Sequence, residues 1–251
     1  MYRALTFTVA ALTGVLHSLV RADTPIPFPH PQITEVLFNV PTGDAADANR
    51  DGTRDAAGDE FVEIANPHDK PINLKGYVLT NRRASVAGDT STGVRFAFPD
   101  VVLPAHAVCV VFNGYDSTIP PPVGDQSGLP AEGREGGNSQ FNGVLVFSMK
   151  VKSKGVAFAN NGDWLLLSAP DGTGIDCVSW GEPDPPPPTH ALRLQSVNAN
   201  PKGSVQRLEA DAPLEAHREI NDQPFSPGII PTRTKPAKTG SKPPTPSKPT
   251  R

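Results

Sequence analysis

The sequence predicts an all-β protein folded as an antiparallel β-sandwich. Three observations lead to this class. The chain contains 22 Gly and 29 Pro, its apolar runs are short, and turn-forming residues separate them. No long window after the N-terminal segment has the 3.6-residue periodicity of an amphipathic helix. The length of 251 residues allows one large domain or two small ones.

The individual strands follow from local patterns. Apolar residues alternate along 94–98, as expected of a half-buried strand, whereas 107–112 is continuously apolar and is typical of a central strand covered on both faces. The Asn-Gly and Asp-Gly dipeptides at 161–162 and 171–172 favour tight turns between neighbouring strands. The expected strands are residues 33–38, 61–66, 76–81, 94–98, 107–112, 143–148, 163–168, 175–180 and 204–208.

The segments around these strands predict the domain organisation. Residues 1–22 combine an early Arg, an apolar run and small residues before a cleavage point after Ala22, which is typical of a signal peptide; an N-terminal membrane anchor is the alternative. A Pro-rich lead-in over 23–30 is expected to be extended and loosely held. The folded domain spans 31–229, with a long surface insertion at about 113–142 and a polyproline connector at 182–190, and the basic Pro-rich tail 230–251 is expected to be disordered.

The charge of the chain and its expected export limit the kinds of molecule that it could bind. The net charge is −3, but residues 232–251 carry six Lys or Arg and no acid, so the rest of the mature chain is strongly acidic. An acidic body suits cations and disfavours nucleic acid. No later segment is apolar enough to span a membrane, and we expect a secreted, periplasmic or cell-envelope protein. In such a compartment Cys109 and Cys177 could form a disulfide, although their apolar flanks are equally typical of buried thiols.

An acidic loop is the candidate metal site. Within the stretch 44–64, oxygen-bearing side chains recur at alternate positions, Gly52 permits a tight turn, and the carbonyl of Thr53 would add a main-chain ligand. This is the first half of an EF-hand pattern and predicts calcium with a structural role. The proposed ligands are Asp47, Asn49, Asp51, Thr53, Asp55 and Asp59.

The second half of that pattern is missing. The twelfth position, where an EF-hand has Glu, is Gly58, and Asp59 and Glu60 come one and two positions late. The flanking segments look like strands rather than helices, so we expect a calcium loop that joins two strands and is closed by Asp55 and Asp59. The alternatives are a solvated acidic turn that binds no ion and, less favoured because of its stricter geometry, a magnesium site.

The residues then resemble a known family, the lamin tail domain of secreted bacterial proteins. The stretch 43–81 is similar to the opening of that domain, in which an acidic loop leads into a "DEFVEI" strand and an "L-x-G-[WY]-x-L" strand. Residues 103–113, 158–181 and 204–229 resemble later strands of the family in the same order. The resemblance implies an immunoglobulin-like β-sandwich over 31–229. His106 departs from the family's turn after the proline.

The sequence offers little for catalysis, and we expect no enzyme. The five histidines after residue 22 form no H-E-x-x-H motif, and no G-x-S-x-G elbow occurs. The apolar flanks of Cys109 argue against a nucleophile, and no aromatic platform surrounds the Asp47 and Asp59 carboxylates. The leading hypothesis is an exported binding or structural module that acts on an unidentified protein or envelope polymer. The alternatives are envelope attachment through the basic tail, for which a solubilising spacer is the competing role, and a small secreted hydrolase.

Overall fold

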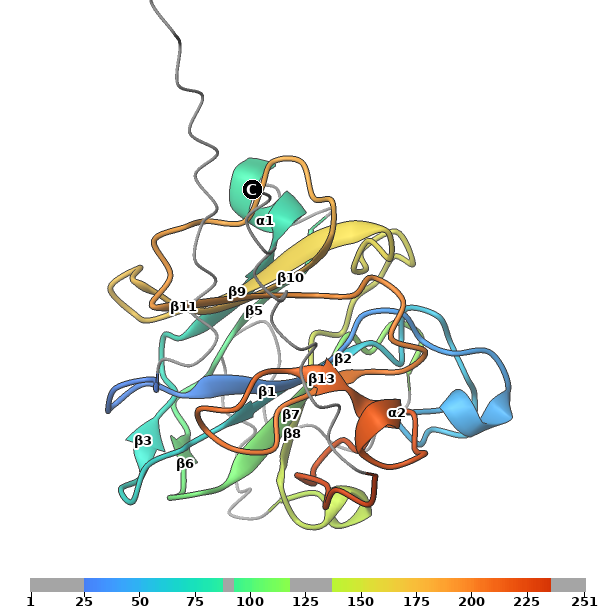
Figure 1. The fold of residues 1–251 in the computed structure, drawn as a ribbon, viewed down its shortest axis with the longest axis horizontal. Helices are drawn as coiled ribbons and strands as arrows, with labels where there is room; N and C mark the ends of the chain where they lie inside the picture. The colour runs from blue at the N-terminus through green and yellow to red at the C-terminus, as the bar shows by residue number, and fades with distance from the viewer. Residues whose placement is uncertain (1–24, 88–92, 118–136, 236–251) are drawn as a thin grey trace, which may run out of the picture.

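The fold is given by a computed structural model, which describes residues 25–87, 93–117 and 137–235 (Figure 1). Short strands account for most of its regular structure, with two short α-helices and two single-turn 3-10 helices between them. In chain order these are β1 (Gln32–Leu37), η1 (Asp44–Ala46), β2 (Phe61–Ala65), β3 (Ile72–Asn73), β4 (Val78–Asn81), α1 (Arg82–Ala87), β5 (Arg95–Ala97), β6 (Val102–Leu103), β7 (Val108–Phe112), η2 (Ser139–Phe141), β8 (Leu145–Ser148), β9 (Gly162–Ser168), β10 (Gly174–Gly181), β11 (Arg193–Val197), β12 (Val205–Gln206), β13 (Glu215–Ala216) and α2 (His217–Ile220).

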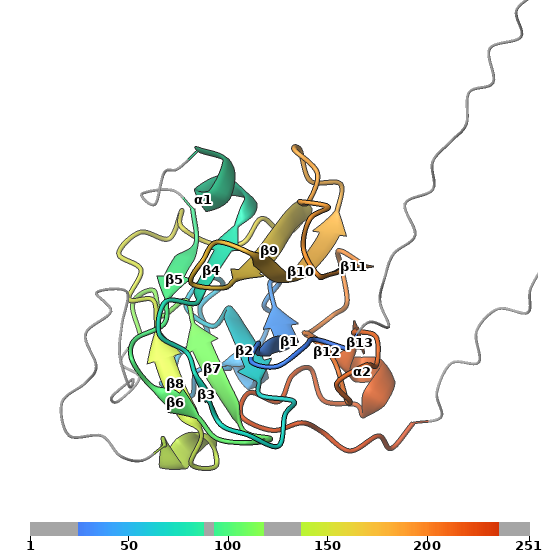
Figure 2. The same cartoon turned by 90° about the vertical axis from the view of Figure 1, so that its left-hand side faces the viewer.

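The strands form two main sheets that stack as layers (Figure 2). One sheet has the order β13-β12-β1-β2-β7-β8 and the other β11-β10-β9-β4-β5, while β3 and β6 make a separate two-stranded ribbon. Most neighbouring strands are antiparallel; β7 with β8 and β10 with β11 are parallel pairs at sheet edges. The predicted all-β, immunoglobulin-like sandwich is therefore confirmed.

The main core lies between the two sheets. The indole of Trp180 on β10 stacks on the ring of Phe38, with centroids 4.1 Å apart and planes inclined by 7°. The Trp180 indole nitrogen donates to the carbonyl oxygen of Ala159 at 2.8 Å, which satisfies the ring's polar atom inside an apolar core. Phe96, Phe98 and Phe147 pack edge to face near the other end of the same core.

Two smaller apolar clusters cover the outer faces of the sheets. On the six-stranded sheet, Leu37, Phe61, Val110, Phe112, Val146 and Phe141 pack together with Ala46 and Ala48 of the acidic loop. On the five-stranded sheet, Cys177 packs with Trp164 and Leu166. Cys109 instead points into the core between the sheets, so the two cysteines lie in different layers and both thiols are free.

All nine expected strands occur in the structure, and four were not predicted. β11 begins three residues after the expected polyproline connector 182–190, and it pairs in parallel with β10 from Asp176↔Arg193 to Trp180↔Val197. Its side chains alternate between buried and partly exposed positions over only five residues, too short a pattern to stand out beside the prolines. β3, β6 and β13 have two residues each, below the length that periodicity can reveal.

Two of the expected segments outside the strands differ from expectation. The lead-in is held down, not loose, because Ile26 is buried in the main core and the His30 ring bonds the Tyr77 hydroxyl at 2.7 Å. The insertion expected at 113–142 does not lie wholly on the surface, because Asn113 and Phe141, near its two ends, are buried where they cap or cover a sheet. Its middle, 118–136, lies outside the described residues. The expected signal peptide and most of the basic tail also lie outside them. No helix among the described residues has both the length and the apolar character needed to cross a bilayer.

Candidate functional site

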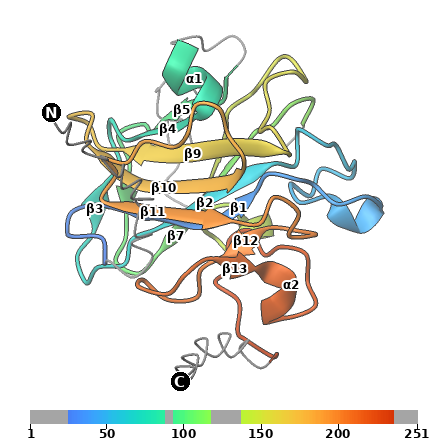
Figure 3. The same ribbon diagram turned by 45° about the horizontal axis from the view of Figure 1, so that its top comes forward.

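The acidic loop joins β1 to β2 across one end of the sandwich. Figure 3 shows it, with η1 at its tip, at the end opposite to β3. Ala46 and Ala48 are buried against the outer face of the six-stranded sheet, and the Arg50 guanidinium lies 4.7 Å from the centroid of the Phe141 ring. Arg54 bonds the carbonyl oxygens of Pro41 and Val40 at 2.9 and 2.8 Å. These contacts fix both halves of the loop on the body of the domain.

The first half of the loop is a turn built on side-chain oxygens. The backbone N–H of Asp51 donates both to Asp47 Oδ1 at 3.2 Å and to Asn49 Oδ1 at 3.0 Å, so these two oxygens converge on one amide. Asp47 Oδ2 accepts from the N–H of Gly52 at 2.9 Å, and the φ of Gly52, +94°, lies in the left-handed region that favours glycine. Asp51 Oδ1 in turn accepts from the N–H of Thr53 at 2.9 Å.

The second half is organised by Asp55 and Asp59. Asp59 accepts from the N–H of Asn49 at 2.9 Å and from the N–H of Asp55 at 2.6 Å, so this carboxylate ties the two turns together. Asp55 Oδ1 accepts from the N–H groups of Ala57 and Gly58, and its Oδ2 pairs with the ammonium of Lys154 at 3.0 Å.

Burial makes Asp59 an unusual carboxylate. Its side chain is inaccessible to solvent, and this desolvation raises its pKa to about 6, against the lowering effect of its backbone hydrogen bonds. The negative charge of Asp47 contributes to this increase in the pKa of Asp59. At neutral pH the loop therefore holds a mostly ionised, buried carboxylate beside a second acid, an arrangement that a cation would stabilise.

The base of the loop is closed by a second buried acid, Glu60. Glu60 Oε2 accepts from the N–H of Phe158 at 3.0 Å and from Asn113 Nδ2 at 3.4 Å. Desolvation raises the pKa of Glu60 well above its usual value. Beside it, Gly58 leaves no room for a side chain, because a Cβ there would meet the carbonyl oxygen of Tyr115 at 2.4 Å. This contact explains why the EF-hand glutamate has no counterpart at position 58.

The structure brings some of the predicted ligands together and separates others. Asp47, Asn49 and Asp51 share one turn, and Asp59 joins them through Asn49, whereas Asp55 is turned toward Lys154. Within residues 25–87, 93–117 and 137–235, no group of three or more His, Cys, Asp or Glu residues is placed to hold a metal ion. The donors are all oxygens, the chemistry that calcium prefers, and each accepting oxygen keeps a second lone pair. The donor type thus fits calcium, while closure round an ion would require the side chains to turn.

One arrangement that the sequence did not single out is a buried Ser–His pair. His217 of α2 contacts Ser226 Oγ through Nε2 at 2.9 Å and the carbonyl oxygen of Gln223 through Nδ1 at 2.9 Å. The neighbouring acid, Glu35, contacts the serine rather than the histidine. In a nucleophilic triad the acid orients the histidine. Here His217 is fully buried and its second nitrogen faces a carbonyl, so the pair has the contacts of a structural clasp.

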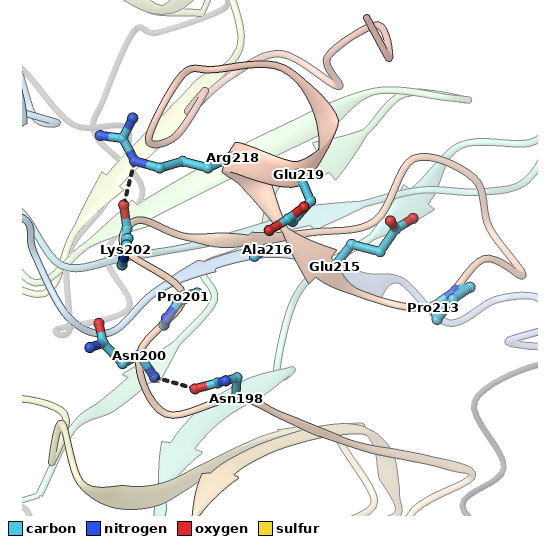
Figure 4. Close-up of a pocket in the computed structure, with 9 residues that line it drawn as sticks. All are labelled: Asn198, Asn200, Pro201, Lys202, Pro213, Glu215, Ala216, Arg218 and Glu219. Atoms are coloured by element: carbon cyan, nitrogen blue, oxygen red, sulfur yellow. Dashed lines mark hydrogen bonds between the residues drawn. The ribbon is translucent and has the colours of Figure 1, made fainter. Parts of the chain in front are cut away.

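A polar cavity of 620 Å³ lies beside this clasp, between the segment after β11 and the β13–α2 corner (Figure 4). Its charged groups are engaged with one another or with main chain: Arg218 donates to the Lys202 carbonyl oxygen at 2.7 Å, and Glu215 pairs with Arg233 at 2.5 Å. No aromatic side chain lines the cavity, so it lacks a stacking surface for sugars or bases. Two acids, Glu215 and Glu219, are among the residues that line it (Figure 4).

Comparison with protein families agrees with the resemblance seen in the residues. The family model of the Lamin Tail Domain matches residues 29–182, more than half of the chain. The chain belongs to the lamin tail domain family. The match includes the acidic loop and the strands from β1 to β10, and it ends before β11, so the resemblance noted for 204–229 lies outside it. No curated protein matches the chain.

Proposed function

We propose that this lamin tail domain is an exported, non-enzymatic binding or structural module whose acidic loop binds calcium for stability. The observation that carries the proposal is the convergence of Asp47 Oδ1 and Asn49 Oδ1 on the amide of Asp51, with the buried Asp59 carboxylate accepting from the N–H of Asn49 in the same turn. The loop already gathers several side-chain oxygens on one turn, and a cation among its carboxylates would offset their repulsion once the side chains turned toward it.

The ion would be held by Asp47, Asn49 and Asp51, with the carbonyl of Thr53, and Asp55 and Asp59 would complete the set. In the structure Lys154 places its ammonium 3.0 Å from Asp55 Oδ2 and so supplies positive charge at one side of the loop. A cation at Asp55 would have to displace this lysine. Lys154→Gln should therefore strengthen calcium binding if Asp55 is a ligand and leave it unchanged if it is not.

The test is thermal unfolding of residues 23–251 with calcium and with a chelator. Ligand at about 100 times its Kd adds about 2.7 kcal/mol to the free energy of unfolding, which for a domain of this size raises the Tm by about 5–10 °C. We expect that rise for the wild type and none for Asp51→Ala. Asp44→Ala is the matched control, because Asp44 is an exposed acid of the same loop outside the proposed ligand set. An unchanged Tm of the wild type would disprove the calcium site.

The non-enzymatic part of the proposal is supported by the side chains that could have reacted. Cys109 is fully buried, and desolvation raises the pKa of its thiol well above the ordinary value. Ser226 is tied to His217 without an acid behind the histidine. The lamin tail domain is itself a non-catalytic, immunoglobulin-like domain type. Turnover in a hydrolase panel that is lost in Ser226→Ala would overturn this assignment.

A second candidate is attachment to anionic envelope polymers through the basic tail, and it rests on the six Lys or Arg and no acid within 232–251. The first two of these basic residues already form ion pairs with the domain, Arg233 with Glu215 and Lys235 with Asp222. We expect retention on an acidic polysaccharide matrix to fall steeply with salt. A variant of the same length with Gln at 238, 242, 248 and 251 should lose this retention. Equal retention of the variant and the wild type would favour the role of a solubilising spacer.

A further inference from the structure

Two glutamates face each other on the outer side of the six-stranded sheet. Glu35 on β1 and Glu63 on β2 are partners in the antiparallel register, and both side chains are fully buried. Side chains at directly opposed positions have Cβ atoms about 4.5–5.5 Å apart. Among the ion pairs of the described residues, none includes either carboxyl. Two acids thus share a site without a cation.

The chain that follows α2 covers this pair. We call residues 221–230 the C-terminal strap. The N–H of Ser226 donates to Glu35 Oε1 at 3.0 Å, and the N–H of Gly228 donates to Glu63 Oε2 at 2.9 Å. Between these contacts and α2, the Phe225 ring packs edge-on against Phe61, with centroids 6.4 Å apart. The strap is further bonded by the N–H of Ser204 to the Pro224 carbonyl oxygen and by His217 to Gln223 and Ser226, so the two carboxyls are its polar contacts to β1 and β2.

The neighbouring polar groups indicate where a proton can reside. Thr34 Oγ1 contacts Glu63 Oε1 at 2.9 Å, and Ser204 Oγ contacts Glu35 Oε1. Gln206 is the partner of Glu35 on its other side, on β12, and its buried Oε1 has no hydrogen-bond partner. A protonated Glu35 brings a donor next to this unsatisfied acceptor, which an ionised Glu35 does not.

Electrostatics require the pair to hold a proton over part of the accessible pH range. Burial raises the pKa of Glu63 to about 7, and burial together with the charge of Glu63 raises the pKa of Glu35 well above its usual value. Two neighbouring carboxylates that lack a counter-ion repel one another strongly in a low-dielectric site. Once both carboxyls are ionised, contact with water lowers their electrostatic free energy and so favours an open site.

We propose that Glu35 and Glu63 form a proton-dependent latch: the C-terminal strap stays closed over the sheet while the pair holds a proton and opens when both carboxyls are ionised. Because the folded state binds protons more tightly than the open one, closure is favoured at low pH and lost as pH rises through neutrality. Opening would uncover apolar side chains that the strap contacts, Phe61 under Phe225 and Phe141 beside Gly228. The latch thereby couples exposure of an aromatic surface to pH.

The other ionisable groups around the pair do not titrate in this way. His217 reaches Glu35 only through Ser226, and burial lowers its pKa, so it is neutral where the latch opens. Cys109, on the adjoining strand β7, stays a thiol because burial and the charge of Glu63 both raise its pKa. On the solvent side of α2 and the strap, the charged groups are Arg218, Glu219 and the pairs Arg233–Glu215 and Lys235–Asp222.

Hydrogen exchange of the mature chain tests the latch. Protection of the strap's amides, corrected for the intrinsic pH dependence of exchange, should fall between pH 6 and 8.5 by up to about tenfold per pH unit for one released proton. Protection of β9 and β10 should stay constant. Glu63→Gln should flatten the slope for the strap. Glu60→Gln is the matched control and should keep the wild-type slope, because Glu60 is equally buried but touches Phe158 and Asn113, not the strap.

A constant protection of the strap in the wild type, or an equal slope in Glu63→Gln, would overturn the proposal. If Glu63→Gln does not fold, the wild type alone still decides it. A ¹³C NMR titration of the glutamate side-chain carboxyls should show the Glu63 resonance titrating near pH 7 and the Glu35 resonance well above its ordinary range, both together with the strap's amide shifts. Glu60, whose pKa burial also raises, is identified by the resonance that disappears in Glu60→Gln. Titration of the Glu35 and Glu63 resonances at ordinary acidic pH would show that the pair holds no proton near neutrality.

Discussion

The α-carbon of Gly58 lies against the carbonyl of Tyr115. A Cβ on Gly58 would come within 2.4 Å of that oxygen, and the Gly58 carbonyl accepts the N–H of Gly114 at 3.2 Å. The acidic loop is thus pressed against the segment that leaves β7 at the position where an EF-hand would supply its last ligand. The loop has to complete any ion site with other oxygens, and its backbone tolerates no side chain here.

Gly58→Ala should therefore destabilise the domain. The added methyl group overlaps main chain rather than a movable side chain, and overpacking of this kind costs about 1–3 kcal/mol. Urea unfolding followed by tryptophan fluorescence measures the loss. Gly155→Ala is the control, because the nearest atom to its added Cβ is the Ser153 hydroxyl oxygen at 3.7 Å. Gly58→Glu, which restores the EF-hand residue, should destabilise further and not improve calcium binding.

The effect of calcium should depend on pH through Asp59. Its raised pKa, about 6, means that without an ion Asp59 contributes stability below about pH 4 and loses it as pH rises toward 6. Calcium would reverse this dependence, because the ion favours the ionised carboxylate. We expect the calcium-induced rise in Tm to be larger at pH 7.5 than at pH 5.5. An equal rise at both values would exclude Asp59 as a group linked to the ion.

The two thiols should be unreactive in the native state. Cys109 lies in the core between the sheets and Cys177 beneath Trp164 on an outer face, and burial raises the pKa of both. A thiol-specific reagent should label neither cysteine in buffer and both in denaturant, with no prior reduction. Labelling in denaturant only after reduction would reveal a disulfide and contradict the placement of the two side chains in different layers.

The strands that could be predicted are those whose own residues, or the turns directly beside them, form a recognisable sequence pattern. β7 reads as a continuous apolar run because both of its faces are covered, and β9 and β10 are marked by the Asn-Gly and Asp-Gly turns beside them. The family motifs then gave the order of the strands. The membership was confirmed over 29–182.

The parts that could not be predicted depend on contacts distant in sequence. Phe141 stands in a polar, glycine-rich stretch, yet it is fully buried because Phe112 and Arg50 pack on it. The buried acids are a similar case: Glu35 and Glu63 look like ordinary exposed strand residues until the strap covers them. In the acidic loop the alternation of oxygens was visible, but the turn of Asp55 toward Lys154, 99 positions away, was not.

The last prediction concerns the fully buried ion pair that joins the sheets. Arg193 on β11 pairs with Asp176 on β10, and Asp176 Oδ2 also accepts the N–H of Ile33 on β1 at 2.9 Å, so one carboxylate serves both layers. Asp176→Ala should cost about 3–5 kcal/mol, because it leaves a buried guanidinium and an orphan amide. Asp100→Ala, which breaks the exposed pair with Lys75, should cost less than about 1 kcal/mol. Both values come from denaturant unfolding at pH 7. Comparable losses in the two variants would mean that water reaches Arg193 once its partner is removed.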